Sequence, residues 1–472
     1  MTFQYIRLAN EIESKILKGD FQAGEKLPSL RTMHNESQNS ISTIHQAYIE
    51  LERRGIIEAK EKSGFFVKAI LKYQSDTPEL AKCQKTPQKV NINKLMQSIT
   101  DKLGNTNLTS VGLSIPANDI IPLKQFSRIF KSITQQDMDQ IFGYDRPMGC
   151  LDLRRQIAKR TIGVSGRISS DEIVITNGCM DAIGLCLRAV AKPGDIIGVE
   201  SPTYSGFLQL IEQNNMYALE LPTHITEGLE VKNLEETLDA HQVKACLLNP
   251  SYQNPLGFVM SNENRERLVD LMAQKNIPII EDDVFGELHF NEKRLSTLKS
   301  FDKKGLVLYC SSFSKTLAPG LRVGWAIPGA YTEQVQALKS NLSLSSAKLN
   351  QHVVVQFLKN GSYERQLRYI RNELKKQMCD LKLAVLRYFP KDTRISNPDG
   401  GLNLWVQLNN SIDSVELHKE ALLENILVTP GILSSVSGKY RNCIRLGCGK
   451  PLDNKLKNAI QNLGRIIYDM IL

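Results

Sequence analysis

Hydrophobic residues at the start of the chain recur every three or four positions, which is the period of an amphipathic helix. The residues of this first stripe are Ile6, Ala9, Ile12, Ile16 and Leu17. Gly19 and Asp20 end the pattern. A second short helix is predicted near Pro28, and a third begins at a hydroxyl cap, either Ser40 or Ser42. The stripe of the third helix consists of Ile41, Ile44, Tyr48 and Leu51.

After Gly55 the pattern changes from helical to that of a hairpin. Two apolar-rich runs in IIEAKEKSGFFVKAI flank a polar turn from Lys60 to Gly64, which favours two antiparallel strands. Three helices followed by a hairpin predict a winged helix-turn-helix unit over residues 1–70. From about 73 to 105 the chain turns polar, with two prolines and no sustained apolar period. We interpret residues 71–106 as a linker with room for short helical pieces.

Beyond the linker, strand-like runs alternate with helical patterns. The apolar runs are DEIVIT, DIIGVE, ACLLNP, IPIIED and LVLYCSS. This alternation predicts a mainly parallel sheet covered by helices, and therefore an α/β domain over residues 107–472. At 472 residues the chain is too long for one compact core, so the chain is expected to be multidomain.

Composition changes this picture little. The chain has 42% hydrophobic and 23% charged residues, as a packed globular protein does. Its formal charge of +9 fits a nucleic-acid partner without requiring one. The nine cysteines form no C-x-x-C pair, so we expect reduced thiols and no metal site. Because the N-terminus resembles no signal peptide and no run of about 18 apolar residues exists, we predict a cytoplasmic protein without membrane segments.

The segment LPSLRTMHNESQNSISTIHQAYIELERRGIIEAKEKSGFFV resembles the GntR family of winged-helix repressors over the first 70 residues. The resemblance implies that the protein binds double-stranded DNA. Arg31 would contact the phosphate backbone, and Gly64 would let the wing approach the minor groove. The hydroxyls of Ser40, Ser42 and Thr43 would lie at the N-terminus of the recognition helix, where small donors reach phosphates or base edges.

Two features of this unit depart from a strongly basic DNA-binding surface. Ile41 occupies the position beside the hydroxyls where the family commonly has an arginine. Residues 1–72 hold 11 basic and 9 acidic residues, an excess of only +2. We therefore expect modest affinity per subunit and a homodimer that combines its phosphate contacts. The alternative is that Arg31 is a solvated surface residue and that the hydroxyls only cap a helix.

Residues 311–325, SSFSKTLAPGLRVGW, combine a lysine with hydroxyls and an arginine after the strand-like run LVLYC. This segment resembles the Schiff-base loop of fold-type I pyridoxal 5'-phosphate enzymes, in the form found in the MocR subfamily of GntR regulators. The resemblance covers nearly the whole chain except the linker. It implies an aminotransferase-like fold with a large domain around Lys315 and a small C-terminal subdomain from about residue 350.

The resemblance assigns each group of the cofactor to residues of this chain. Lys315 would form the Schiff base, because only a primary amine forms an imine with the cofactor aldehyde. Asp282, which lies 33 positions before Lys315, would face the pyridine nitrogen. Asn254 would bind the phenolic oxygen, and Tyr204 would stack on the ring. The phosphate would be held by Ser312, Ser314, Arg322 and the backbone of Gly178, Cys179 and Met180.

Two further residues extend the resemblance beyond the cofactor. Tyr144 would reach the phosphate in a partner subunit, which implies a homodimer with shared sites. Arg445 would clamp the α-carboxylate of an amino acid. Each of these residues taken alone would also fit a structural role, such as a surface lysine or a capping serine. Their order along the chain is what favours the cofactor site.

One departure concerns turnover. The family usually has a tyrosine soon after the aspartate, and this chain has Val284 and Phe285 there. We therefore expect cofactor binding to survive better than catalysis. The leading hypothesis is a regulator that senses an amino acid, an amine or pyridoxal phosphate itself. The alternatives are a working aminotransferase with an accessory DNA-binding domain and a scaffold that has lost its cofactor.

Overall fold

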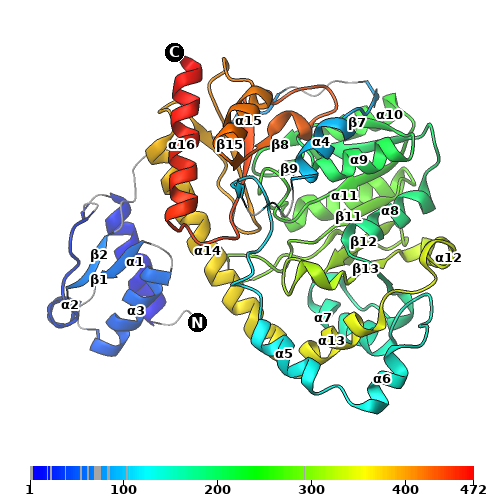
Figure 1. The fold of residues 1–472 in the computed structure, drawn as a ribbon, viewed down its shortest axis with the longest axis horizontal. Helices are drawn as coiled ribbons and strands as arrows, with labels where there is room; N and C mark the ends of the chain where they lie inside the picture. Colours follow the sequence, from blue (N-terminus) through cyan, green and yellow to red (C-terminus); the bar gives the residue numbers. More distant parts are fainter. Residues whose placement is uncertain are drawn as a thin grey trace.

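The computed structural model describes residues 4–18, 20–21, 24–37, 39–53, 56–60, 63–67, 76–81, 86–102, 105, 107–291 and 293–472. Gly19 and Gly55, named above as helix ends, lie outside these residues. The N-terminal unit (blue) forms a lobe beside a larger α/β body (Figure 1). The predicted fold class, a winged helix-turn-helix joined to an aminotransferase-like α/β domain, is confirmed.

The N-terminal lobe contains the three predicted helices and the hairpin. Its elements are α1 (Gln4–Lys18), α2 (Leu30–Ser37), α3 (Ile41–Arg53), β1 (Ile57–Lys60) and β2 (Gly64–Val67). The apolar stripes of the helices form one core, in which Ala9, Ile44 and Leu51 are fully buried. The two strands pair antiparallel, with Lys60 opposite Gly64. The Tyr48 hydroxyl donates to the carbonyl of Pro28 at 2.8 Å and fixes α3 against the start of α2.

The described part of the predicted linker is docked on the α/β body. Its elements are β3 (Gln88–Lys89) and α4 (Asn93–Thr100). Strand β3 pairs antiparallel with the edge strand β7 (Tyr217–Leu221). Further towards the N-terminus, Leu80 packs against a cluster of buried aromatic residues that includes Trp405. The polar composition of the linker gives no hint of these contacts, because they depend on a few apolar residues.

The body is built around an eight-stranded mixed sheet in the order β3-β7-β6-β10-β11-β12-β13-β5. The strands not yet introduced are β5 (Val174–Thr176), β6 (Ile196–Glu200), β10 (Val243–Leu248), β11 (Ile279–Asp282), β12 (Val307–Ser312) and β13 (Gly324–Ile327). Strands β7, β6, β10, β11 and β12 run parallel to one another. Strand β13 is antiparallel to both of its neighbours, β12 and β5. The prediction of a mainly parallel sheet is therefore correct.

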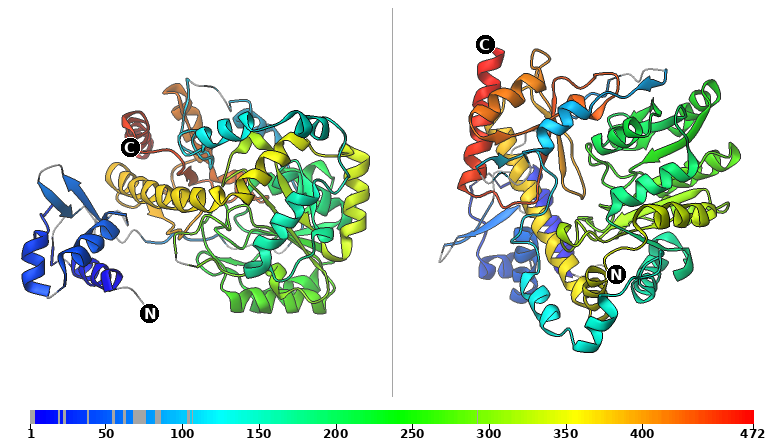
Figure 2. Two further views of the ribbon diagram at one scale, coloured as in Figure 1. Left: turned by 90° about the horizontal axis from the view of Figure 1, so that it is seen from below. Right: turned by 45° about the vertical axis from the view of Figure 1, so that its right-hand side comes forward.

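Helices cover both faces of this sheet (Figure 2). The cluster on one face includes residues of α8 (Cys179–Val190) and α9 (Ser205–Gln213), with α12 (Thr332–Ser343) beside them. The cluster on the other face includes α10 (Val231–Ala240) and α11 (Asn262–Gln274). Helices α5 (Leu123–Lys131), α6 (Gln135–Ile141), α7 (Leu151–Ser165) and α13 (Lys348–Lys359) complete the body. Because both faces are covered, the central strands are apolar throughout rather than alternating.

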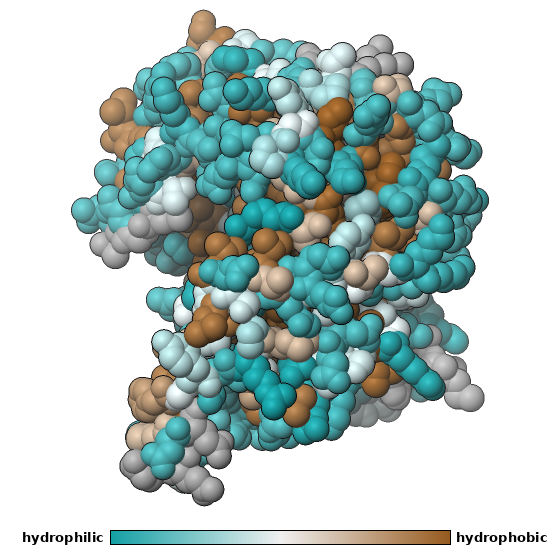
Figure 3. Space-filling view, turned by 90° about the vertical axis from the view of Figure 1, so that its right-hand side faces the viewer, coloured by the Kyte–Doolittle hydropathy of each residue, from teal (hydrophilic) through white to brown (hydrophobic). Residues whose placement is uncertain are grey.

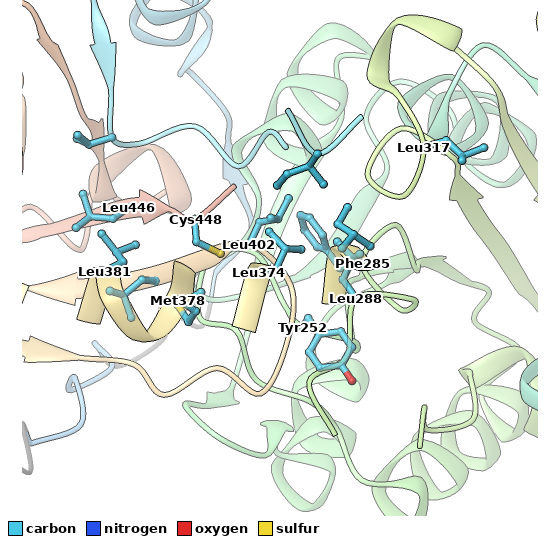
Figure 4. Close-up of a cluster of buried hydrophobic side chains, with 14 of the residues drawn as sticks. Tyr252, Phe285, Leu288, Leu317, Leu374, Met378, Leu381, Leu402, Leu446 and Cys448 are labelled. Atoms are coloured by element: carbon cyan, nitrogen blue, oxygen red, sulfur yellow. The ribbon is translucent and has the colours of Figure 1, made fainter. Parts of the chain in front are cut away.

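The long helix α14 (Ser362–Tyr388) leads to a second, smaller sheet. This four-stranded sheet has the order β14 (Arg394–Ile395), β15 (Asn403–Gln407), β18 (Cys443–Gly447) and β17 (Thr429–Pro430). It packs with α15 (Ser414–Leu423) and α16 (Asn454–Ile471). One hydrophobic cluster joins the two sheets, with Phe285 and Leu288 on one side and Leu402 and Leu446 on the other (Figure 4).

A polar contact also fastens the small sheet to the large one. The buried carboxylate of Glu220, in β7, accepts a hydrogen bond from Lys439 Nζ at 2.7 Å. The same carboxylate accepts bonds from the Ser435 and Ser437 hydroxyls. These charge-assisted bonds hold the Glu220 pKa below its ordinary value despite the opposing effect of burial.

The surface is mixed in polarity. The face shown in Figure 3 carries mainly hydrophilic side chains with scattered hydrophobic patches. In the described part of the chain, no helix has the length and apolar content needed to span a lipid bilayer.

Candidate functional site

The candidate site lies at one edge of the central sheet, where parallel strands end together. The segments that follow β5, β6, β10 and β12 carry Gly178, Tyr204, Asn254 and Lys315, in that order, and Asp282 is the last residue of β11. Ligands bind at this edge in open α/β sheets, because the loops after the strands converge there. Strand β13 begins at the same edge, with Gly324 opposite both Ser312 and Thr176. This register brings Arg322 beside Ser312 and the start of α8.

Lys315 lies in the loop after β12, and its side chain is half-buried. Its Nζ donates to the carbonyl oxygen of Ser114 at 2.7 Å. Burial and the nearby guanidinium of Arg445 lower the pKa of Lys315 to about 8, although Asp282 acts in the opposite direction. About a tenth of the amine is therefore neutral at pH 7, far more than for an ordinary lysine, and the neutral form is the one that attacks a carbonyl carbon.

Asp282 ends β11 with its carboxylate buried beneath the site. Its Oδ1 accepts from the Val284 backbone N–H at 2.9 Å. Burial raises the Asp282 pKa to about 6. Asp283, the next residue, accepts a 2.8 Å hydrogen bond from Tyr309 and forms an ion pair with Arg294. The strand alternation therefore separates the two carboxylates, and only Asp282 is near Lys315.

Cys179 gives a correction to the sequence analysis, which assigned it a backbone role only. Its Sγ lies 3.3 Å from Asp282 Oδ1 and donates to that oxygen. Burial, followed by the charge of Asp282, raises the Cys179 pKa well above its ordinary value, so the thiol stays protonated. The side chain therefore helps to hold the carboxylate. The sequence gives no signal for this contact, because α8 and β11 are about a hundred residues apart.

A chain of buried amides positions Asn254. The Asn249 side chain accepts from the Asn254 backbone N–H at 2.8 Å and donates to the Asp282 carbonyl at 2.7 Å. The Asn249 backbone N–H donates to the Glu200 carboxylate. Burial raises the Glu200 pKa to about 8. Sequence reasoning identified Asn254 but missed Asn249 and Glu200, whose only signal is their place at the ends of β10 and β6.

The start of α8 has the features of an anion-binding site. Its N-cap, Gly178, has no side chain to satisfy the first backbone amides. Gly178 has φ +99°, and a Cβ there would lie 2.4 Å from Arg322 Nη2, so the guanidinium packs directly against the loop. Ser312 and Ser314 are buried next to it. Unpaired helix amides, two hydroxyls and a cation form a donor set that fits a phosphate dianion. Met180 lies in the first turn of α8.

Arg445 is a buried cation whose hydrogen-bond acceptors are neutral. Its Nη1 donates to Asn254 Oδ1 at 3.0 Å, and its Nη2 donates to the Gly112 carbonyl at 3.0 Å. Within the described residues it forms no ion pair with a carboxylate. Burial lowers its pKa below the ordinary value. A buried cation without a counter-ion favours an anionic ligand. Tyr204 lies close enough to oppose this shift electrostatically.

Two further positions from the sequence analysis are Tyr144, which was predicted to reach a partner subunit, and Phe285, which stands where the family usually has a tyrosine. Tyr144 is 85% exposed and does not join the cluster around Lys315 in this subunit. It lines a surface hollow together with Phe142 and residues 345–349. Phe285 is buried, and Lys315 Nζ lies 5.9 Å from the centre of its ring. The third position after Asp282 therefore presents an apolar ring towards the lysine and no hydroxyl.

The predicted DNA-contacting residues lie on α2, at the start of α3 and at the start of β2. Arg31 is exposed on α2, and Gly64 begins β2 with φ +101°. Ser40 is the cap of α3, because its Oγ accepts from the Thr43 backbone N–H at 3.1 Å. Ser42 lies in the first turn of α3 and is exposed.

Comparison with known proteins matches both parts of the chain. Residues 4–67 match the model of bacterial regulatory proteins of the gntR family, and residues 111–463 match aminotransferase class I and II. The HTH-type transcriptional regulator YjiR of Escherichia coli (strain K12) is 34% identical, over 98% of this chain and 99% of that protein. The HTH-type regulator NorG of Staphylococcus aureus (strain USA300) is 27% identical, over 93% of this chain and 98% of its own.

Solved structures resemble the aminotransferase-like part. The Pyrococcus horikoshii kynurenine aminotransferase has a TM-score of 0.73 and 27% identity, covering 81% of this chain and 95% of that one. The α-aminoadipate aminotransferase LysN of Thermus thermophilus, complexed with N-(5'-phosphopyridoxyl)-L-leucine, has a TM-score of 0.73 and 27% identity, covering 80% and 95%.

Proposed function

The chain belongs to the GntR family of bacterial regulators with the MocR-like architecture, in which an aminotransferase class I and II domain follows the DNA-binding unit, and we propose that it regulates transcription in response to an amino acid or amine. Pyridoxal phosphate is the cofactor of this domain. The observation that carries the proposal is the buried guanidinium of Arg445, which has no anionic partner in the described chain and lies near Lys315.

Each residue of the site has a role that its position supports. When bound, pyridoxal phosphate supplies an aldehyde that reacts with amines and a ring that withdraws electrons. Lys315 presents a partly neutral amine. Asp282 is placed to hold a proton at the ring nitrogen, and Asn254 to donate to the phenolic oxygen. Ser312, Ser314, Arg322 and the first turn of α8 would bind the phosphate, and Tyr204 would cover the ring.

An effector carboxylate at Arg445 would link the two sheets. Arg445 belongs to β18 of the small sheet, whereas Lys315 follows β12 of the large sheet. A ligand that engages both therefore favours one arrangement of the sheets over others. The described residues 76–81 and 86–102 contact both sheets, through Leu80 and through β3. A change in that arrangement would thus reach the DNA-binding unit at the N-terminus.

We further propose a cytoplasmic homodimer. The limits that we propose are residues 1–70 for the DNA-binding unit, 71–106 for the linker and 107–472 for the aminotransferase-like domain, whose small subdomain begins at about residue 350. Tyr144 would contact the cofactor phosphate of the partner subunit, and its 85% exposure in one subunit supports this role. Two DNA-binding units would then engage one operator, with Arg31 on phosphates and with the start of α3 and the Gly64 turn against the grooves.

The test is a DNA-binding measurement with the region upstream of the chain's own gene. The full-length protein is titrated into labelled duplex with and without pyridoxal phosphate, and a scrambled duplex of equal length is the control. We expect a sequence-specific complex whose midpoint changes with the cofactor or with added amino acids. A protein that binds both duplexes equally under all conditions would contradict the proposal.

A second candidate function is aminotransfer. The retention of Lys315, Asp282, Asn254 and Arg445 in one cluster favours it, as does the similarity to aminotransferases. The apolar ring of Phe285 near Lys315 disfavours it, because no hydroxyl is supplied from that position. Sustained exchange between amino acids and 2-oxo acids over many turnovers would support this function. A single stoichiometric conversion would fit the regulator.

A further inference from the structure

Helix α3 has one buried face and one exposed face, which is uncharged over its first turns and becomes acidic at Glu50 and Glu52. Its buried side chains are Ile44, Ala47, Tyr48 and Leu51. The residues on the opposite side are Ser42, His45, Gln46 and Ile49, all of which are exposed, and Ile41 at the helix start borders this face. No lysine or arginine lies between Thr32 and Glu52. The one lysine or arginine of α3 is Arg53, at its last position, so the preceding turns have to distinguish bases by amide hydrogen bonds and apolar contacts.

The hydroxyls at the start of α3 are already engaged with one another. Ser40 Oγ lies 2.8 Å from Ser42 Oγ and 2.8 Å from Thr43 Oγ1. It also accepts the backbone N–H of Thr43. These hydroxyls stabilise the helix N-terminus, so less of their hydrogen-bonding capacity is available for bases. The remaining side chains able to discriminate bases on the exposed face lie further along the helix.

Two large apolar side chains are exposed here, within a small domain whose other apolar residues form its core. Ile41 is 45% exposed and Ile49 is 47% exposed. Gln46 lies between them in sequence and is exposed, about one turn before Ile49. If these isoleucines faced only phosphate groups, DNA binding would bury no apolar surface against them and would gain no hydrophobic stabilisation from them. The thymine C5 methyl is the apolar group that the major groove presents, and adenine presents the donor and acceptor pair that a glutamine amide matches.

We propose that the exposed face of α3 recognises A·T base pairs in the major groove. Gln46 forms two hydrogen bonds to an adenine, and Ile41 and Ile49 contact thymine methyl groups. This inference rests on the proposed DNA-binding function and adds the class of sequence that is bound. Apart from Arg53 at the end of α3, cations of the lobe lie on other elements, such as Arg31 on α2 and Lys60 at the end of β1. Phosphate binding and base recognition are therefore carried by different elements.

The experiment begins with full-length protein, loaded with pyridoxal phosphate, and a pool of random-sequence duplex DNA. Selected duplexes are expected to share A·T-rich half-sites. The decisive measurement replaces each selected thymine by uracil, which removes only the methyl group. Fluorescence anisotropy should then show a loss of about fourfold per contacted methyl, the equivalent of one buried methylene. Loss of the Gln46 amide in Gln46→Ala should reduce discrimination at one A·T pair by about fivefold or more.

Variants separate the methyl contacts from other effects. Ile41→Ala and Ile49→Ala should each bind weaker to the thymine duplex and respond less to the uracil substitution. Ile162→Ala, at a residue 59% exposed in α7, is the matched control and should behave as the wild type. The salt dependence of binding should be equal in all four proteins, because no phosphate contact is removed. Circular dichroism checks that each variant is folded, and the uracil duplexes test the wild type without any mutation.

The outcomes separate this inference from the proposed function. A sequence-specific complex that is rich in G·C, or one that is unaffected by uracil, would overturn the A·T inference and leave DNA-dependent regulation standing. The absence of any sequence-specific complex would overturn both.

Discussion

The buried guanidinium of Arg445 gives the sharpest prediction, for the substitution Arg445→Met. In the structure Arg445 donates three hydrogen bonds, to Gly112 O from Nε and Nη2 and to Asn254 Oδ1 from Nη1. Both acceptors are neutral, so the cation is desolvated without a counter-ion. Gly112 O also accepts a bond from the Thr429 hydroxyl at 3.0 Å, and that bond remains in the variant.

The magnitudes for folding and for binding differ. Removing the buried cation avoids the cost of desolvating it, whereas losing its hydrogen bonds to neutral acceptors is destabilising. Because these effects oppose each other, we expect the free energy of unfolding of the ligand-free protein to change by no more than about 2 kcal/mol. An amino-acid carboxylate would lose a charge-assisted pair worth about 2–5 kcal/mol, which corresponds to a loss in affinity of about thirtyfold or more. Ligands with an amine but no carboxylate would lose little.

The assay is a spectroscopic titration of pyridoxal phosphate-loaded protein with a panel of amino acids and matched amines. The control is Arg441→Met, because Arg441 is four residues away, is exposed, and pairs with Asp413 outside the site. We expect that control to bind as the wild type does. If Arg445→Met retained amino-acid affinity within about threefold, or lost amines and amino acids equally, the assignment of Arg445 to the carboxylate would be wrong.

Three further predictions concern the aminotransferase-like domain. Lys315→Ala should lose the visible absorbance of the cofactor-loaded protein while keeping its fold, which absorbance and circular dichroism measure together; unchanged colour would contradict the assignment of Lys315. Asp282→Asn should stabilise the cofactor-free protein at pH 7 by about 1–3 kcal/mol, because burial raises the Asp282 pKa to about 6. The ionised carboxylate of the wild type destabilises the fold increasingly from about pH 4 to 6, and fully above pH 6. Denaturant titrations should therefore show that the gain in stability vanishes below about pH 4. Lys439→Ala should destabilise the protein by about 1–3 kcal/mol, because the buried Glu220 carboxylate keeps only its neutral donors; equal stability in urea would rule this out.

The sequence predicted the residues that follow strands better than the contacts between distant segments. Lys315, Asp282, Asn254, Tyr204 and Gly178 could be found because each lies in a short motif that resembles the family's, at or after the end of an apolar run, and parallel strands end at a common edge. The choice of Asp282 over Asp283 followed from the family resemblance, from the spacing to Lys315 and from strand alternation. These inferences need only short motifs along the sequence and a rule about sheets.

Contacts between elements far apart in sequence could not be predicted in this way. The thiol of Cys179 against Asp282, the carbonyl of Gly112 at Arg445 and the carbonyl of Ser114 at Lys315 all depend on three-dimensional packing. The docking of the polar linker was missed for the same reason, since it depends on a few apolar residues, such as Leu80 and Val90, in a polar stretch. The role of Tyr144 involves a second subunit and stays a prediction.

The strand β3 has a practical consequence for dissecting the protein. It covers Tyr217 and Ala218 at the margin of the central sheet, and Leu80 shields Trp405 and its aromatic neighbours. A fragment starting at residue 107 would leave β7 with unsatisfied backbone groups, which invite association with other chains. A fragment starting at residue 76 keeps both coverings and should therefore remain dispersed at concentrations where the shorter one precipitates.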